Sequence, residues 1–65
     1  MSRIVLKREG DETWLQTAIR QAARHGLQRE VQSSYDQWHT QGAETWQAAL
    51  WACMDWDVAD WEEEP

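Results

Sequence analysis

Residues 13–35 read TWLQTAIRQAARHGLQREVQSSY, and this stretch contains the signals for one complete helix and for the start of a second. Thr13 and Gln16 fit a capping box, in which the hydroxyl and the amide each accept a backbone N–H at the helix start. Gly26 is the residue type that most readily adopts the left-handed conformation at a helix end. These signals predict a first helix over residues 13–25.

Apolar residues recur at helical spacing on both sides of that glycine. They predict a second helix over residues 28–40, which stops before Gly42, and a third helix over residues 44–55. The connections are short, so the three helices should pack against one another. Cys53 is expected to be buried on the third helix. The predicted core residues are Trp14, Leu15, Ile19, Leu27, Val31, Tyr35, Trp46 and Leu50.

A short extended segment precedes the helices. Residues 3–7 read RIVLK, and Ile4, Val5 and Leu6 favour a strand. A single strand needs a partner, and two alternatives stay open: pairing with residues near Val58 or pairing with a second copy. The predicted fold class is therefore mainly α, a compact three-helix unit with a short extended N-terminal segment. It forms a single small domain over residues 1–65 with an acidic C-terminal segment, 55–65.

The chain is small for an independent domain. Proteins of about 60 residues bury only about 60% of the surface that the unfolded chain exposes, so their stability is marginal. A single cysteine excludes a disulfide within the chain and suits a reducing compartment. There is no signal-peptide pattern and no apolar run of the roughly 20 residues that a membrane span needs. We expect a cytoplasmic protein without a cofactor or membrane partner, as a monomer or weak homodimer.

Tryptophan replaces the usual aliphatic core residues. Phe is absent and Leu, Ile and Val are few, whereas six Trp residues are present. Most of them are expected to fill the core. Six cannot all be buried in so small a protein, so one or two should lie on the surface, available to a partner or a second copy.

The net charge of −6 lies at one end of the chain. Residues 1–54 carry six basic and six acidic residues, whereas residues 55–65 carry six acidic residues and no basic one. A concentrated anionic segment attracts basic surfaces and repels nucleic acid. Three interpretations stay open: a binding surface, a solubilising tail, or a segment that folds back onto the chain's own arginines. The presence of Trp56 and Trp61 among the acids favours the first.

Few residues could carry catalysis or bind a metal. His25 and His39 lie on different predicted helices and Cys53 is expected to be buried, so a Cys–His nucleophile pair is not indicated. His39, Cys53 and Asp55 lack a recognised metal-ligand spacing. The sequence therefore predicts no enzyme, no catalytic residue and no metal site.

Direct DNA binding is not the favoured function. Ala22 and Gly26 have the spacing of a helix-turn-helix turn, and Arg24 and Arg29 flank it. The net negative charge opposes phosphate binding, because Lys and Arg supply most of the affinity for nucleic acid. Helix packing and capping explain the same alanine and glycine.

Part of the chain is similar to viral sequences. The stretch ETWLQTAIRQAARHGLQREVQSSY, followed after a glycine by AALWACMDWD, resembles short helical proteins of bacteriophages and prophages. The resemblance covers residues 12–58 and assigns no catalytic residue. It implies a viral accessory protein, and small acidic phage proteins often inhibit host machinery, anti-CRISPR proteins among them. The matching positions are Thr13, Trp14, Ala18, Ile19, Gly26, Leu27, Val31, Tyr35, Ala49, Leu50, Trp56 and Asp57.

The predicted function is a phage-encoded inhibitor of the anti-CRISPR type. It would bind the basic nucleic-acid-binding surface of a host protein with an acidic, DNA-mimicking face. The alternative is a small phage structural or regulatory protein that self-associates or binds a viral partner through exposed Trp. The residues expected to meet the partner are Asp55, Trp56, Asp57, Asp60, Trp61, Glu62, Glu63 and Glu64, with Asp36 and Glu44 as helical additions.

Overall fold

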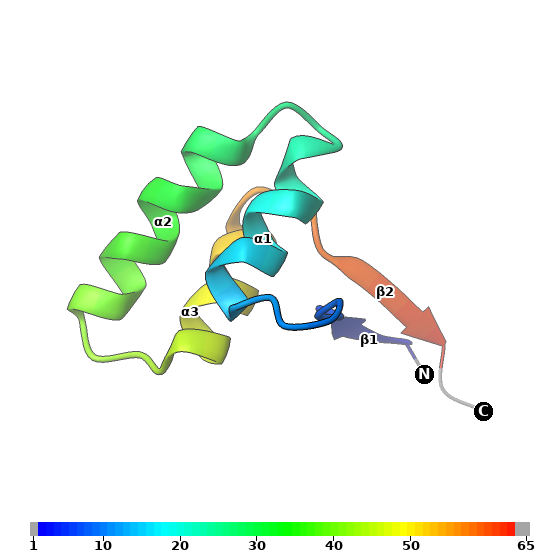
Figure 1. Ribbon diagram of the computed structural model, residues 1–65, viewed down its shortest axis with the longest axis horizontal. Helices are drawn as coiled ribbons and strands as arrows, with labels where there is room; N and C mark the ends of the chain where they lie inside the picture. Colours follow the sequence, from blue (N-terminus) through cyan, green and yellow to red (C-terminus); the bar gives the residue numbers. More distant parts are fainter. Residues whose placement is uncertain (1, 64–65) are drawn as a thin grey trace.

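The computed structural model describes the backbone of residues 2–63 and the side chains of residues 4–60. Three helices pack together, and a two-stranded ribbon projects from one side of them (Figure 1). This arrangement confirms the predicted mainly α, three-helix fold with an extended N-terminal segment. The elements are β1 (Ser2–Val5), α1 (Trp14–Ala23), α2 (Gln28–Thr40), α3 (Thr45–Asp55) and β2 (Asp60–Glu63).

The ends of α1 follow from local sequence, as predicted. Thr13 Oγ1 accepts the backbone N–H of Gln16 at 3.1 Å, and Gln16 Oε1 accepts the N–H of Thr13 at 2.9 Å. At the other end, Gly26 has a φ of +70°, and the Leu27 N–H donates to the Ala22 carbonyl at 3.0 Å. This is the Schellman arrangement, in which the left-handed residue is ordinarily glycine. The predicted bounds of α2 are confirmed as well.

The core is built mainly from small residues. Ala18 and Ala22 of α1 face Ala48, Ala49 and Ala52 of α3, and all five are fully buried. Short side chains let the helix axes lie close together. Of the predicted core residues, Val31 and Tyr35 are buried, whereas the following are half-buried: Trp14, Leu15, Ile19, Leu27 and Leu50.

The prediction that Trp46 is buried is wrong. Its side chain is 46% exposed, and its indole N–H donates to Glu44 Oε2 at 2.7 Å. Apolar residues occupy almost every position between 46 and 54, so the periodicity does not single out one face of this helix. The alanine face packs more closely against α1 than a face containing a Trp ring would. The buried face of α3 consists of Ala48, Ala49, Ala52 and Cys53.

β1 and β2 form an antiparallel pair at the end of the molecule where both termini lie (Figure 1). Ile4 lies opposite Trp61, and Val5 lies opposite Asp60. The N-terminal strand therefore pairs with the acidic end of its own chain, and residues 60–63 are a strand and not a frayed tail. The acidic end therefore folds back onto β1, and the charge of Asp60 also interacts with that of Arg20 on α1. Every helix within residues 2–63 is too short or too polar to cross a lipid bilayer.

Candidate partner-binding surface

α3 ends in the same hydrogen-bonded arrangement as α1, but with an aspartate in the glycine position. Asp57 has a φ of +53°, and the Val58 N–H donates to the Cys53 carbonyl at 2.9 Å. Val58 is 1% exposed and anchors the turn in the core, whereas Asp57 is exposed. The turn therefore holds a carboxylate in solvent at the C-terminal end of the helix.

Three exposed carboxylates surround this turn, on Asp55, Asp57 and Asp60. Trp38 Nε1 donates to Asp55 Oδ2 at 2.8 Å, and Gln21 Nε2 donates to Asp60 Oδ1 at 2.9 Å. Each bond orients a carboxylate and leaves its second oxygen able to accept from another donor. Within the described residues, Asp55 and Asp57 form no ion pair.

Two of these carboxylates lie where the helix dipole disfavours negative charge. The C-terminal end of a helix carries a partial charge of about −0.5, which favours a cation there. The last turn of α3 contains no basic residue and ends at Asp55, with Asp57 two positions beyond. An anion in this position is expected to cost a few tenths of a kcal/mol, roughly the reverse of what a cation would contribute.

Basic residues are confined to the first half of the sequence. Arg29 is the last Lys or Arg, whereas residues 30–65 contain nine Asp and Glu residues. α3, the turn after it and β2 therefore contain no lysine or arginine that could neutralise the acids. Basic residues reach this segment from elsewhere in the fold: Arg3 of β1 lies opposite Glu62 of β2 in the strand register, and the charge of Arg20 interacts with that of Asp60.

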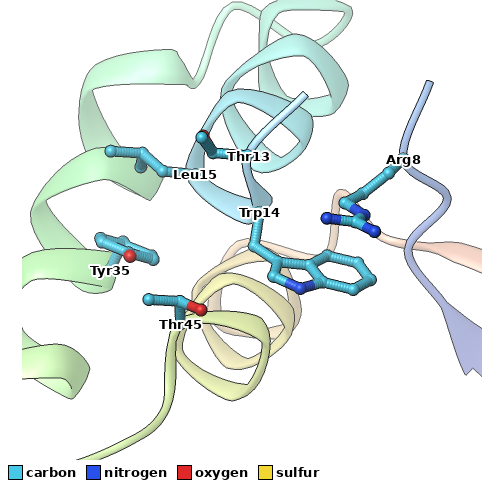
Figure 2. Close-up of a pocket in the computed structure, with 6 residues that line it drawn as sticks. All are labelled: Arg8, Thr13, Trp14, Leu15, Tyr35 and Thr45. Carbon is cyan, nitrogen blue, oxygen red and sulfur yellow. The ribbon is translucent and has the colours of Figure 1, made fainter. Parts of the chain in front are cut away.

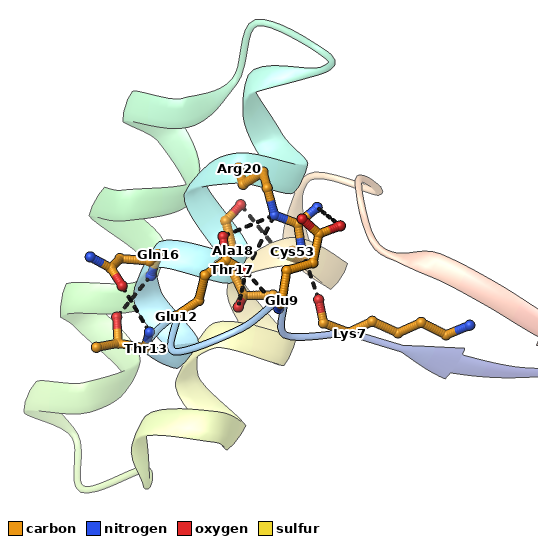
Figure 3. A network of polar contacts seen from close by, with 9 residues as sticks. All are labelled: Lys7, Glu9, Glu12, Thr13, Gln16, Thr17, Ala18, Arg20 and Cys53. Atoms are coloured by element: carbon orange, nitrogen blue, oxygen red, sulfur yellow. Dashed lines mark hydrogen bonds and ion pairs between the residues drawn. The ribbon is translucent and has the colours of Figure 1, made fainter.

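Arg20 is already bound to acids of its own chain (Figure 3). Its Nε donates to Glu12 Oε2 at 3.0 Å, its Nη2 donates to the Lys7 carbonyl at 2.8 Å, and its Nη1 lies 3.6 Å from Glu9 Oε1. The hydrogen bond from Arg20 lowers the pKa of Glu12, and the same bond raises the pKa of Arg20. The arginine thus ties the loop between β1 and α1 to α1.

Aromatic rings border the acidic turn. Trp38 of α2 and Trp51 of α3 meet edge to face, with ring centroids 4.9 Å apart and an angle of 66° between the planes. Together with Met54 and Asp55 they line a hollow of about 280 Å³. We call this hollow the Trp38–Trp51 pocket.

Two large apolar side chains face solvent here: Met54, which lines the pocket, and Trp56, two positions later in the sequence. Met54 is 46% exposed and Trp56 is 42% exposed. The Trp56 indole N–H donates to Ser34 Oγ at 2.9 Å, which fixes the orientation of the ring while its surface stays open. Exposed Trp and Met are enriched at the centres of protein–protein interfaces.

The structure brings together only part of the predicted site. Asp55, Trp56, Asp57 and Asp60 surround the end of α3, as described above. Glu44 immediately precedes α3, so it lies at the opposite end of that helix from Asp55.

Asp36 faces a different direction from the acidic turn. It lies two positions before Trp38 on α2, which is about 200° around the helix axis. It lines a separate hollow together with Ser33, Gln37, Thr40 and Gln41. The backbones of Trp61, Glu62 and Glu63 belong to β2, but their side chains lie outside the described residues, and Glu64 lies outside them entirely.

Sequence reasoning missed three residues of this surface: Trp38, Trp51 and Met54. Trp38 follows Leu27, Val31 and Tyr35 at helical spacing along α2, a stripe that suggested a core role. The residues whose spacing suggested the inner face of α3 are Trp46, Ala49, Leu50 and Cys53. Trp51 lies to one side of them, and that displacement was the available signal. Only the crossing of α2 over α3 brings the two rings together.

The chemically reactive side chains are placed as structural residues. Cys53 is fully buried with its Sγ 4.0 Å from the Ala18 carbonyl, and burial raises the pKa of its thiol to about 11. A buried, protonated thiol is a poor nucleophile. The His39 ring stacks on Tyr35 with centroids 5.8 Å apart. Among the described residues, no group of three or more His, Cys, Asp or Glu side chains could hold a metal ion.

A second hollow, of about 450 Å³, lies where the N-terminal loop meets the helices (Figure 2). The Arg8 guanidinium lies 4.8 Å from the centroid of the Trp14 ring, in cation–π contact. This contact holds the loop over α1, so the hollow is separate from the acidic turn. Its lining residues are Arg8, Thr13, Trp14, Leu15, Tyr35 and Thr45.

Comparison of the chain with protein-family models, with curated proteins and with solved structures found no match. The functional argument therefore rests on the charge and geometry of this surface.

Proposed function

We propose that the chain is a phage-encoded inhibitor of a host defence protein that binds nucleic acid, of the anti-CRISPR type. It acts in the cytoplasm of the bacterial host cell and occupies a basic surface that otherwise holds phosphates. The single observation that carries this proposal is the end of α3. There Asp55 and Asp57 are exposed, form no ion pair within the described residues, oppose the helix dipole and lie beside the exposed ring of Trp56.

Both aspartates occupy positions that local stability disfavours. Glycine would adopt the left-handed backbone at position 57 without strain, and a neutral or basic residue at position 55 would suit the helix dipole. Residues that break local rules are expected at functional sites. Asp55 accepts the Trp38 indole N–H, but within the described residues neither aspartate forms an ion pair, and a partner with a basic surface supplies that opposite charge.

The mode of binding follows from the chemistry of phosphate recognition. Arginines that hold phosphates can pair with carboxylates through the same charge-assisted hydrogen bonds. Trp56 and Met54 provide apolar anchors beside the acids, and such anchors supply much of the binding energy of an interface. Charge attraction speeds the encounter, and salt reduces that gain. In the sequence, Asp60, Glu62 and Glu63 add three further acids to this segment.

The test is expression of the chain in bacterial strains that each carry one active CRISPR system, challenged with a phage that the system targets. The proposal expects plating efficiency to rise by orders of magnitude in a strain whose effector the chain binds. Addition of the chain should then displace labelled target DNA from the purified effector. The displacement should be weaker at high salt. Unchanged plating in every strain, together with no displacement of DNA, would contradict the proposal.

A second candidate function rests on the exposed apolar side chains of α3. Trp46, Met54 and Trp56 are each more than 40% exposed, and a second copy of the chain could cover them. In that case the protein is a small structural or regulatory phage protein that self-associates. Light scattering in 1 M salt distinguishes the two, because an apolar dimer persists in high salt whereas the inhibitor stays monomeric.

A further inference from the structure

We infer that the Trp38–Trp51 pocket receives one arginine side chain of the basic partner. This inference rests on the proposed function and deepens it, because it names the side chain that the surface recognises and the position where it binds.

The pocket combines two features that a guanidinium group needs. Trp38 and Trp51 supply aromatic surface, and rings of this kind attract a cation placed over them. Asp55 supplies a carboxylate at the wall of the same hollow. Its Oδ2 is held by the Trp38 indole N–H at 2.8 Å, so Oδ1 keeps a fixed orientation and can accept hydrogen bonds from a partner.

Charge decides what kind of side chain the pocket accepts. An apolar side chain would remove water from the Asp55 carboxylate without replacing its hydrogen bonds, which is costly. An acidic side chain would be repelled, since residues 30–65 contain no Lys or Arg to offset nine acids. A basic side chain can lie against the aromatic rings and donate hydrogen bonds to the carboxylate.

Arginine fits better than lysine because of its shape and hydration. The guanidinium plane can stack on an aromatic ring while its N–H edge points at a carboxylate. The lysine ammonium is more strongly hydrated and presents a point charge, so it gains less from the Trp surface. A cation–π contact at an exposed site corresponds to about a two- to five-fold gain in affinity.

The experiment uses the full chain with its six indole N–H signals assigned by NMR. Two peptides of equal length and charge serve as probes, one alternating Arg with Gly and the other alternating Lys with Gly. We expect the Arg peptide to shift the indole signals of Trp38 and Trp51 more than that of Trp14, and to bind more tightly than the Lys peptide by up to about five-fold.

Two matched variants separate the pocket from general charge attraction. Asp55→Asn keeps an oxygen that can accept from the Trp38 indole but removes the charge, and it should abolish the preference for the Arg peptide. Asp57→Asn removes the same charge outside the pocket, so it should weaken both peptides equally and keep the preference.

The outcomes distinguish this inference from the proposed function. Equal binding of both peptides, or equal effects of the two variants, overturns the arginine pocket and leaves an acidic surface that binds by charge alone. If neither peptide binds, both the pocket and the proposed function fail. If the Trp38 and Trp51 signals shift with protein concentration alone, a second copy occupies the pocket and the inference is wrong.

Discussion

Replacing Asp57 with glycine should stabilise the isolated protein while weakening its binding to a basic partner. Asp57 has a φ of +53° in the turn that ends α3, and glycine adopts that conformation freely. The same replacement removes an anion from the negative end of the helix dipole.

The size of the effect follows from three contributions. Relief of the left-handed backbone is worth about 1 kcal/mol, and removal of the anion is worth about 0.3–1 kcal/mol. The greater conformational freedom of glycine in the unfolded chain reduces this stabilisation by about 0.4–1 kcal/mol. The free energy of unfolding should therefore rise by about 0.3–1.6 kcal/mol, or roughly 1–13 °C in melting temperature for a domain of this size. Asparagine adopts the same left-handed backbone as aspartate, so Asp57→Asn should raise the free energy of unfolding only by the electrostatic contribution.

Thermal and urea unfolding followed by Trp fluorescence measure this gain. Gly26→Asp is the matched control, because Gly26 has a φ of +70° in the equivalent turn and a Cβ added there meets nothing within 4 Å. It should destabilise the protein by about the amount that Asp57→Gly stabilises it. If Asp57→Gly melts at or below the parent temperature, the turn carries no local cost and the argument from strain fails.

Three further predictions test the rest of the fold. Trp46→Ala should cost about 1 kcal/mol in urea unfolding, well below the roughly 3–5 kcal/mol of a buried Trp, because its side chain is 46% exposed. The pKa of Glu12 is lowered in the folded chain, so its bond to Arg20 stabilises the fold fully above the unfolded pKa of about 4.5. That stabilisation is lost as the pH falls through the pKa of Glu12 in the folded chain. Glu12→Gln should therefore make the free energy of unfolding less dependent on pH in this range. The Cys53 thiol, with a pKa of about 11, should resist a thiol reagent at pH 8 until the chain is unfolded, and rapid labelling of the folded chain would contradict its burial.

The helix boundaries could be predicted because each is set by a few neighbouring residues. The capping box at Thr13 and Gln16 and the glycines at 26 and 42 act within one turn of the chain. The end of α3 uses the same backbone geometry, but Asp57 replaces the expected glycine. That end was therefore predicted from the loss of apolar periodicity and not from a stop signal.

Features that depend on distant residues could not be predicted in the same way. The pairing of β1 with β2 joins the two ends of the chain, and two short strands give no local signal of register. The inner face of α3 was predicted only in part: Ala49 and Cys53 are buried as expected, but Trp46 is exposed. Apolar residues surround this helix, and only packing against the alanines of α1 decides which of them are buried.

The candidate site likewise contains residues that the sequence identifies and a pocket that depends on how distant segments pack. Composition alone pointed to Asp55, Trp56, Asp57 and Asp60, because the charge imbalance lies in that segment. The Trp38–Trp51 pocket needed the α2–α3 crossing, which no local pattern encodes.

The most direct test of the central claim is displacement of labelled DNA from a purified CRISPR effector that the chain inhibits. The double variant Asp55→Asn with Asp57→Asn is compared with Asp11→Asn with Asp36→Asn, which removes the same charge from exposed positions elsewhere. The account predicts that the first double variant loses at least ten-fold in displacement while folding at least as stably as the parent. It predicts that the second double variant displaces DNA like the parent. Equal losses in the two variants would mean that net charge, and not the surface at the end of α3, carries the inhibition.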